Sequence, residues 1–310
     1  MKIAVVGPGA LGCLMAAYLS NKNETWLLDH DKNRAALLDR QGLILERNKL
    51  IVKRPVRATS DPNNIGTVDL ILLCVKSYNI EKAILNAGPL VGTDSLIISL
   101  QNGIAHLALL PGLLRDTRWG LGITSNGATL AEPGHVLHCG KGLTRIGFLD
   151  EVEQAQNMDL MSKAASSLTE SNIETEIVPD ILKHIWTKLM VNIGINALTA
   201  IYDCPNGDLL KSTEITGIME KAVREGITVA EQKGIIFEQD PLATTHKVCR
   251  ETAANISSML QDVRAKRKTE ISSINGALVD IAGKLGIATP VNEELVCKIK
   301  KLEAKYHDFT

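Results

Sequence analysis

The opening stretch, MKIAVVGPGALG, restricts the fold of this chain more than any other part of the sequence. Lys2 to Val6 is a short apolar run rich in β-branched residues, which favours a buried strand. The glycines that follow have the spacing Gly-x-Gly-x-x-Gly, and Ala10 to Leu19 continues as a helix-compatible segment. A strand, tight turn and helix start of this kind can bind the pyrophosphate of a dinucleotide through backbone N–H groups. The residues expected at the pyrophosphate are Gly7, Gly9, Ala10, Leu11 and Gly12.

The alternative interpretation of this stretch is an ordinary strand-to-helix turn, because a glycine triplet alone is a weak motif. Its position between a predicted strand and a predicted helix favours the dinucleotide. A plain turn would predict that no nucleotide raises the melting temperature.

Length and composition set the outer limits. A chain of 310 residues is long enough for two domains. Hydrophobic residues make up 45% and the formal net charge is −1, so neither disorder nor a general affinity for nucleic acid is predicted. No signal peptide or membrane-spanning segment is evident, which predicts a cytoplasmic protein without membrane partners.

The cysteines and histidines give no metal-ligand pattern. The six cysteines are scattered, without a C-x-x-C, and are expected to be buried free thiols. His135 and His138 are near neighbours, but no Cys or carboxylate pattern completes a ligand set around them. We therefore expect no metal.

Glu24 to Leu28 is a plausible second strand, and Asp29, His30 and Asp31 follow it. In a dinucleotide-binding unit, an acid after this strand accepts a hydrogen bond from the 2′-hydroxyl of NAD, whereas an arginine suits the 2′-phosphate of NADP. Either aspartate would favour NAD, and His30 with Arg34 leaves NADP open. A solvated acidic loop is the alternative for each aspartate.

Two further apolar runs, Asp69 to Val75 and Ser95 to Leu100, are typical of parallel strands covered on both faces. Ligands of such sheets bind beyond the carboxyl ends of the strands, where Lys76 and Asn102 are expected. Lys76 could instead be a solvated strand end, and Asn102-Gly103 is a common turn pair.

The second half of the chain has a different periodicity. The stretch from Gly120 to Asp150 predicts further strands of the sheet, in antiparallel orientation. Glu151 to Glu170 is expected to form a helix, and Ile173 to Val178 a last strand. Long helical segments then follow: Asp180 to Ala200, Leu209 to Lys233, Pro241 to Leu260 and Ser272 to Leu285. This change predicts an α/β dinucleotide-binding domain over residues 1–179 and a helical domain over residues 180–310.

The first of these later helices carries Lys188, Asn192 and Asn196 at intervals of four residues, on one helix face. Ile185 and Leu189 lie on another, apolar face. Buried amides and ammonium groups need partners, which a polar ligand would supply. A solvated helix face is the alternative.

Several longer motifs make the chain resemble the ketopantoate reductases (2-dehydropantoate 2-reductases), which reduce a 2-keto acid with NADPH during pantothenate synthesis. The similarity runs over nearly the whole chain. Its motifs are GPGALG at 7–12, CVKSYN at 74–79, QNG at 101–103, WTKLMVNIGINALTAIYDCPNG at 186–207 and NISSMLQDVRAKRKTEISSING at 255–276.

The resemblance implies a fold: an N-terminal Rossmann-like domain and an all-α C-terminal domain of the 6-phosphogluconate dehydrogenase type, with the active site between them. It also implies roles. Lys188 would be the general acid, and Lys76 and Asn102 would lie near the nicotinamide and substrate. Glu270 would be the second catalytic residue, at the substrate site, and the other substrate-binding residues would be Asn192, Asn196 and Ser258.

These roles agree with the chemistry of the reaction. Hydride transfer to C2 of a keto acid leaves negative charge on the carbonyl oxygen, which an ammonium can stabilise and protonate. One position departs from the family, because many members have an arginine directly after the second strand. NADP(H) remains the expected cofactor, with Arg34 or His30 assisting, and NAD(H) is the alternative.

Two other functions stay open at this point. One is the reduction of another 2-keto or 3-hydroxy acid on the same scaffold, because substrate choice depends on pocket shape. The other is a non-catalytic dinucleotide-binding sensor. The expected partner is a small 2-keto acid, and a homodimer is compatible with the sequence.

Overall fold

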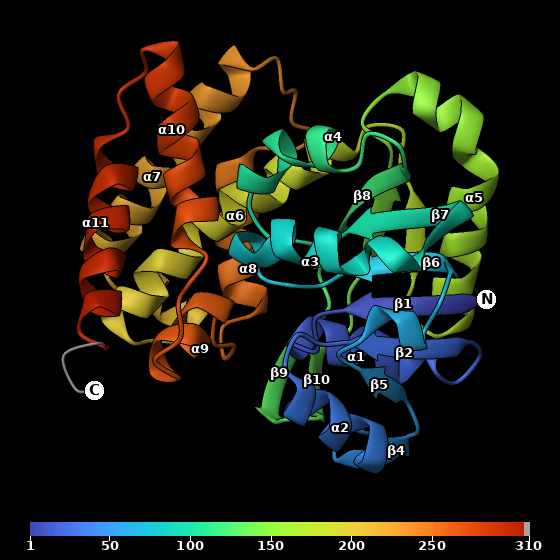
Figure 1. The fold of residues 1–310 in the computed structure, drawn as a ribbon. Helices are drawn as coiled ribbons and strands as arrows, with labels where there is room; N and C mark the ends of the chain where they lie inside the picture. Colours follow the sequence, from blue (N-terminus) through green and yellow to red (C-terminus); the bar gives the residue numbers. More distant parts are fainter. Residues whose placement is uncertain (307–310) are drawn as a thin grey trace. The chain divides into compact units, whose positions relative to one another are not determined.

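The computed structural model describes residues 1–306, and Figure 1 shows its helices and strands. The main sheet has eight strands: β1 (Lys2–Val6), β2 (Glu24–Leu28), β5 (Arg57–Thr59), β6 (Val68–Leu73), β7 (Val91–Ser99), β8 (Arg118–Thr124), β11 (Thr144–Gly147) and β12 (Thr175–Ile177). Their order across the sheet is β12-β11-β8-β7-β6-β1-β2-β5. The six neighbouring strands β8-β7-β6-β1-β2-β5 are all parallel. From β1 the chain adds β2 and β5 on one side, and then crosses to the other side of β1 to add β6, β7 and β8. The switch point of the sheet therefore lies between β1 and β6. Doubly wound α/β folds bind their ligands at this switch point.

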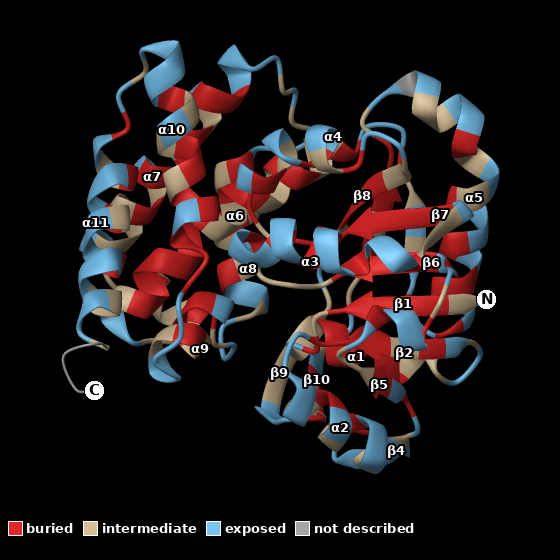
Figure 2. Ribbon diagram, viewed as in Figure 1, coloured by how far each residue is buried: buried red, intermediate tan, exposed pale blue. Residues whose placement is uncertain are grey.

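The parallel strands are buried on both faces, as Figure 2 shows for β1, β6 and β7. Ile3 and Val5 belong to the core that includes residues of α1 and α5, while Ala4 on the opposite face is also fully buried. Burying one such aliphatic side chain stabilises a fold by roughly 1.5–3 kcal/mol. The helices of this part are α1 (Ala10–Leu19), α2 (Lys32–Gln41), α3 (Ile80–Ala87), α4 (Leu110–Leu113) and α5 (Glu151–Glu170).

A second sheet of four strands packs against α1. Its strands, in the order β4-β3-β10-β9, are β4 (Leu50–Arg54), β3 (Leu43–Arg47), β10 (His135–Gly140) and β9 (Gly127–Glu132). The expectation that residues 120–150 add antiparallel strands to the main sheet is confirmed for β11 and wrong for β9 and β10. Strand β8 pairs in parallel with β7, β11 pairs antiparallel with β8, and β9 and β10 leave for the second sheet because β10 pairs with β3.

The rest of the chain is helical: α6 (Ile181–Tyr202), α7 (Thr213–Gln232), α8 (Pro241–Glu251), α9 (Ser258–Arg264), α10 (Asn275–Leu285) and α11 (Pro290–Ala304). Glycines allow close helix packing, because a Cβ at Gly226 of α7 would lie 2.8 Å from Met190 Sδ of α6. Glu225 accepts hydrogen bonds from the backbone N–H groups of Val291 and Asn292, which caps the start of α11.

The helix expected over Pro241 to Leu260 is interrupted. Helix α8 ends at Glu251 and α9 begins at Ser258, where the Ser257 hydroxyl accepts from the backbone N–H of Leu260. Between them, the carbonyl groups of Ala253 and Asn255 accept hydrogen bonds from Gly207 and Asn206. These carbonyls are therefore engaged by another segment, and the chain leaves the helical path.

The chain divides into two compact units, whose limits differ from the expected domain limit in two respects. The first unit is Met1–Gln101 with Leu109–Ile181, and the second is Leu182–Thr310 together with the short segment Asn102–Ala108. Asn102 thus belongs to the helical unit, although it follows strand β7 in the sequence. The limit at residues 179 and 180 stays a prediction for independently folding domains, which limited proteolysis would test.

Other expected features can be compared with the described residues. All six cysteines are free thiols, but Cys139 and Cys297 are exposed, contrary to the expectation of burial. Within residues 1–306 we find no group of three or more His, Cys, Asp or Glu side chains able to hold a metal ion. None of the described helices combines the length and apolar character that a membrane span needs.

Candidate active site

The residues Gly7 to Gly9 connect β1 to α1, and we call them, with the first turn of α1 up to Gly12, the glycine turn. The glycine turn packs closely against neighbouring parts of the first unit. Gly7 has φ +96°, a conformation that favours glycine, and a Cβ there would lie 2.6 Å from Val75 Cγ1. A Cβ at Gly12 would lie 2.0 Å from the Gly7 carbonyl oxygen. The first and third glycines therefore permit the tight turn and the close packing of the following helix.

Gly9 differs from the other two glycines because a Cβ at this position would have no atom within 4 Å. It precedes Ala10 and Leu11, which open helix α1, and among the described residues no side chain caps this helix start. The first N–H groups of a helix have no partner within the helix and bind anions readily. The open space at Gly9 and the uncapped helix start therefore fit a pyrophosphate.

The end of β2 lies beside this turn, since the Gly7 N–H donates to the Leu28 carbonyl at 3.0 Å. The buried Asp29 carboxylate accepts from Arg34 Nε at 2.5 Å and from Arg34 Nη2 at 2.7 Å. It also accepts from the Asp31 backbone N–H, and His30 Nδ1 lies 3.3 Å away. Asp29 is thus occupied by protein donors, which weakens its expected role as an acceptor for a ribose hydroxyl.

The neighbouring groups at the end of β2 remain more accessible. Asp31 caps helix α2 by accepting from the N–H groups of Asn33 and Arg34. The His30 side chain is 84% exposed and that of Arg34 34% exposed. The two hydrogen bonds to Asp29 raise the pKa of Arg34 and fix the orientation of its guanidinium group.

Lys76 lies at the carboxyl end of β6, on the other side of the switch point. It is partly buried and directly precedes a short 3-10 helix, Ser77–Asn79. The loop before it is held by Gln101, whose Nε2 donates to the carbonyls of Leu73 at 2.8 Å and Val75 at 3.3 Å. The sequence interpretation did not single out Gln101; its place directly after a buried strand and before Asn102 is the available signal.

The helical unit brings together three of the predicted residues from distant parts of the sequence. Lys188 Nζ donates to Asn102 Oδ1 at 2.9 Å, and Asn102 Nδ2 is 3.5 Å from Glu270 Oε2. Lys188 lies on α6, Asn102 on the segment that follows β7, and Glu270 directly before a 3-10 helix, Ile271–Ser273. We call these three residues the lysine site.

The environment changes the acidity of the lysine. Burial lowers the pKa of Lys188 to about 8, although the charge of Glu270 opposes this shift. Glu270 itself is 5% exposed. A lysine of this kind remains protonated near neutral pH and releases a proton more readily than a lysine in water.

Asn102 is held in the helical unit by its neighbours. The Ile104 N–H donates to the Ser273 carbonyl at 2.9 Å. Gly103 has φ +78°, and a Cβ there would lie 2.0 Å from the Ser273 carbonyl oxygen. The chain bends at Asn102 and Gly103, with Gly103 in the left-handed region, and this bend places the asparagine next to Lys188.

The other expected substrate residues differ in their surroundings. Asn192 is partly buried and Asn196 is 6% exposed, both on α6. Neither side chain has a hydrogen bond within the described part of the chain. Ser258, the first residue of α9, is exposed, and its side chain makes no hydrogen bond to the lysine site among residues 1–306.

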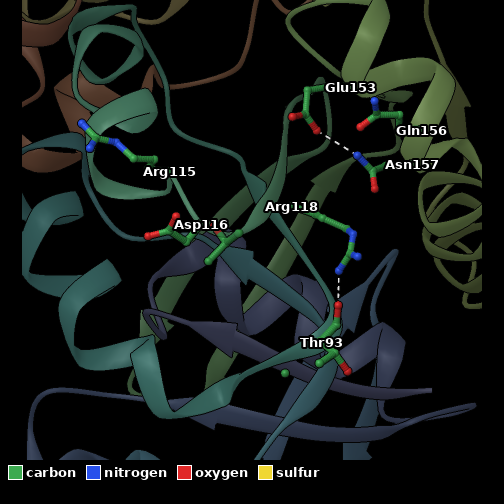
Figure 3. A pocket seen from close by; sticks show the side chains of 9 residues that line it. Thr93, Arg115, Asp116, Arg118, Glu153, Gln156 and Asn157 are labelled. Atoms are coloured by element: carbon green, nitrogen blue, oxygen red, sulfur yellow. Dashed lines mark hydrogen bonds between the residues drawn. The ribbon is translucent and has the colours of Figure 1, made fainter.

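A surface cavity of about 430 Å³ lies elsewhere on the first unit, and Figure 3 shows its lining. Arg118 donates to the Thr93 carbonyl, and Asn157 donates to Glu153 at 2.8 Å. The cavity lies at the amino ends of β7 and β8, whereas the glycine turn follows the carboxyl end of β1. It is therefore not the dinucleotide site.

Comparison with known families matches both parts of the chain. The family model described as "Ketopantoate reductase PanE/ApbA" matches residues 3–151. The model described as "Ketopantoate reductase PanE/ApbA C terminal" matches residues 180–303. The two matches cover the glycine turn and the helix that carries Lys188.

Individual proteins agree with these models. The 2-dehydropantoate 2-reductase of Halobacterium salinarum is 33% identical over 294 residues, covering 94% of this chain and 95% of its own length. That of Pyrococcus horikoshii is 32% identical and covers 98% of each chain.

Solved structures show the same relationship. A PanE/ApbA family ketopantoate reductase from Ralstonia eutropha has a TM-score of 0.89 at 28% identity, covering 99% of this chain and 100% of its own. A ternary structure of D-mandelate dehydrogenase with NADH and anilino(oxo)acetate has a TM-score of 0.92 at 28% identity, covering 99% of each. On the family models and on relatives more than 30% identical over nearly its full length, the chain belongs to the ketopantoate reductase family.

Proposed function

We propose that this chain is an NADPH-dependent 2-dehydropantoate 2-reductase that converts ketopantoate to pantoate in the synthesis of pantothenate. The observation that carries the proposal is the lysine site, in which a lysine with a pKa of about 8 donates to an asparagine that faces a buried glutamate. Full-length relatives in archaea and bacteria are named for the same activity.

The residues of the lysine site have distinct roles in this proposal. A bound nicotinamide supplies the hydride that reduces C2 of the keto acid. Lys188 Nζ stabilises the charge that develops on the carbonyl oxygen and donates the proton to it. Asn102 Oδ1 accepts a hydrogen bond from Lys188 Nζ and so fixes the position of the ammonium group, which limits the reorganisation needed during the reaction.

Substrate binding falls to amides and hydroxyls nearby on the helical unit. Asn192 and Asn196 offer donors and acceptors that the described protein leaves unused, and they can bind the hydroxyl and carboxylate groups of the substrate. Glu270 accepts from the substrate hydroxyl as well as supporting Lys188. Ser258 is assigned to the substrate on its family position, and it would need to face the ligand in the complex.

The family uses a nicotinamide dinucleotide, and we assign the cofactor contacts to the glycine turn. Gly7, Gly9, Ala10, Leu11 and Gly12 hold the pyrophosphate, and Lys76 and Asn102 lie toward the nicotinamide. We propose NADPH as the preferred form. The accessible side chains of His30 and Arg34 can pair with a 2′-phosphate, while the acceptor sites of Asp29 are occupied.

A different 2-keto acid is a second candidate substrate, because a D-mandelate dehydrogenase structure has the higher of the two TM-scores given above. The test is NADPH oxidation by the purified chain with ketopantoate and with phenylglyoxylate and other 2-keto acids. The proposal predicts the highest kcat/KM for ketopantoate. A higher value for another keto acid would select the second candidate, and no turnover with any of them would favour a binding protein.

The cellular location and the oligomeric state of the protein stay predictions. A cytoplasmic enzyme is expected, which cell fractionation tests. Light scattering during gel filtration tests the expected homodimer.

A further inference from the structure

Thr199 and Ser257 form a buried pair of hydroxyl groups in the helical unit, and the proposed reaction assigns no role to either of them. Thr199 lies on α6 and is fully buried, and Ser257 is 7% exposed. Thr199 Oγ1 and Ser257 Oγ share a hydrogen bond of 2.7 Å. Buried hydroxyl groups need partners within the protein, because leaving one unpaired is costly. The partners of this pair show which segments it joins.

On α6, the pair is bonded to the backbone of a proposed substrate residue. Thr199 Oγ1 donates to the carbonyl groups of Ile195 at 2.9 Å and Asn196 at 3.0 Å. A hydroxyl group both donates and accepts, so Oγ1 can bond these carbonyls and Ser257 Oγ together. Asn196 is one of the two asparagines whose side chains we assign to the substrate. Thr199 is therefore tied to the turn of α6 that carries Asn196.

At its other end, the pair holds the start of α9. Ser257 occupies the N-cap position of this helix, and its Oγ accepts from the Leu260 backbone N–H at 3.1 Å. This bond gives one of the first N–H groups of the helix a partner. The next residue is Ser258, which we assign to the substrate as well. One hydroxyl group thus caps α9 and ties its first turn to α6.

Two backbone hydrogen bonds hold the loop before α9 in a different way. The N–H groups of Asn206 and Gly207 donate to the carbonyls of Asn255 and Ala253, each at 3.0 Å. These bonds fix the middle of the loop to a segment that follows α6. The hydroxyl pair instead joins α6 itself to the residue next to Ser258.

We propose that Thr199 and Ser257 are positioning residues for the substrate, which hold Ser258 at a fixed place relative to Asn196. Their effect passes through the backbone of Asn196 and the first turn of α9, so neither hydroxyl needs to touch the ligand. Groups from two segments bind a ligand more tightly when their relative position is set beforehand, because less freedom is lost on binding. The inference rests on the proposed function for its effect on the keto acid, but not for its effect on α9.

Thr199→Val tests the pair in the full chain, because valine has nearly the shape of threonine and lacks the hydroxyl. With saturating NADPH, the KM for ketopantoate should rise roughly three- to tenfold, which is the net contribution of one hydrogen bond. The value of kcat should change by less than about twofold, since the bond between Lys188 and Asn102 is intact. Thr199→Ser keeps the hydroxyl and should return KM to within about twofold of that of the unchanged protein.

Thr245→Val is the matched control. Thr245 is also fully buried, and its Oγ1 donates to the carbonyl four residues earlier, that of Pro241, at 2.8 Å. It lies on α8, and within residues 1–306 its hydroxyl makes no hydrogen bond to α6 or α9. The control variant removes the same chemical group from the same kind of environment, and it should change neither KM nor kcat.

Amide hydrogen exchange measured by NMR tests the start of α9 without any turnover. The Leu260 N–H is bonded to Ser257 Oγ, so Thr199→Val should speed its exchange by about fivefold or more. The same amide should exchange at an unchanged rate in Thr245→Val.

An unchanged KM in Thr199→Val would overturn the proposal, and so would an equal rise in Thr245→Val. If Thr199→Val does not fold, Ser257→Ala takes its place, and the same rise in KM is required. Absence of turnover in the unchanged protein would reject the proposed function. The exchange rate of Leu260 would then decide the positioning role, which an unchanged rate in Thr199→Val would overturn.

Discussion

The glycine turn and the lysine site solve opposite problems. At Gly9 the protein offers open space and backbone N–H groups, and a single added methyl group would occupy the place that we assign to a phosphate. At Lys188 the protein offers side chains that contact one another before any ligand is present. The glycine turn depends on the absence of a side chain at Gly9, whereas the lysine site depends on a connected set of polar side chains. The two should therefore fail in different ways when they are mutated.

The largest effect is expected at the lysine. Lys188→Ala removes the proton donor and should lower kcat by roughly 10²–10⁴-fold, the usual contribution of general acid catalysis. NADPH binding, measured by fluorescence titration, should change by less than about twofold, because the glycine turn is intact. Equal losses in turnover and in NADPH affinity would contradict the separation of the two sites.

A smaller loss is expected when the support of Asn102 is disturbed. Gly103→Ala places a Cβ against the Ser273 carbonyl, so the segment must shift and kcat should fall by roughly 10²-fold. Gly234→Ala is the matched control, because Gly234 also has a positive φ, +75°, but open space around its Cβ position. Both variants should lose stability through backbone strain, about 1–3 kcal/mol. If Gly234→Ala lowers kcat as much as Gly103→Ala, strain alone explains the loss.

The glycine turn is tested by the opposite kind of change. Gly9→Ala fits the backbone, which has φ −75°, and should leave the melting temperature unchanged. It should weaken NADPH binding by roughly tenfold or more, since a methyl group keeps the pyrophosphate from the N–H groups. Gly283→Ala on α10, also with open space, should leave NADPH affinity unchanged and raise the melting temperature slightly, because alanine favours a helix more than glycine does. Unchanged NADPH affinity in Gly9→Ala would place the dinucleotide elsewhere.

The smallest effect concerns cofactor choice. Arg34→Ala removes the cation held by Asp29 and exposes that carboxylate to a ribose hydroxyl. The ratio of kcat/KM for NADPH to that for NADH should fall by about tenfold, the size of one lost charge-assisted contact. Steady-state assays with both cofactors measure it. A ratio that stays the same would remove Arg34 from the NADPH site.

Much of the fold could be predicted from the sequence, because local signals and tertiary structure agree there. The strand Lys2–Val6, the helices Ala10–Leu19 and Glu151–Glu170, and the parallel sheet of the first unit are confirmed. The pairing of β3 with β10, which builds the second sheet, could not be predicted, since residues 43–47 and 135–140 are far apart in the sequence. The break after Glu251 is equally hard to predict, because the carbonyl groups within it pair with the backbone of Asn206 and Gly207, which are far away in the sequence.

The candidate site shows the same limit. The spacing of Lys188, Asn192 and Asn196 predicts a shared helix face, but no spacing reveals that Asn102 belongs to the helical unit. Nor does it reveal that the Asp29 carboxylate is occupied by Arg34. Such contacts depend on side-chain directions after folding, and they decide which of several chemically suitable residues remain available to a ligand.

The central claim is that Lys188 donates the proton from a site that lowers its pKa to about 8. The most direct measurement is the dependence of kcat on pH for keto-acid reduction, from about pH 6 to about pH 10, in the unchanged protein and in Lys188→Arg. Because the protonated amine is the active form, kcat should be highest below the pKa and fall as the pH rises through about 8. The arginine variant should lose this limb together with most of its activity. A kcat that stays constant to about pH 10, or an alkaline limb that persists in Lys188→Arg, would contradict the account.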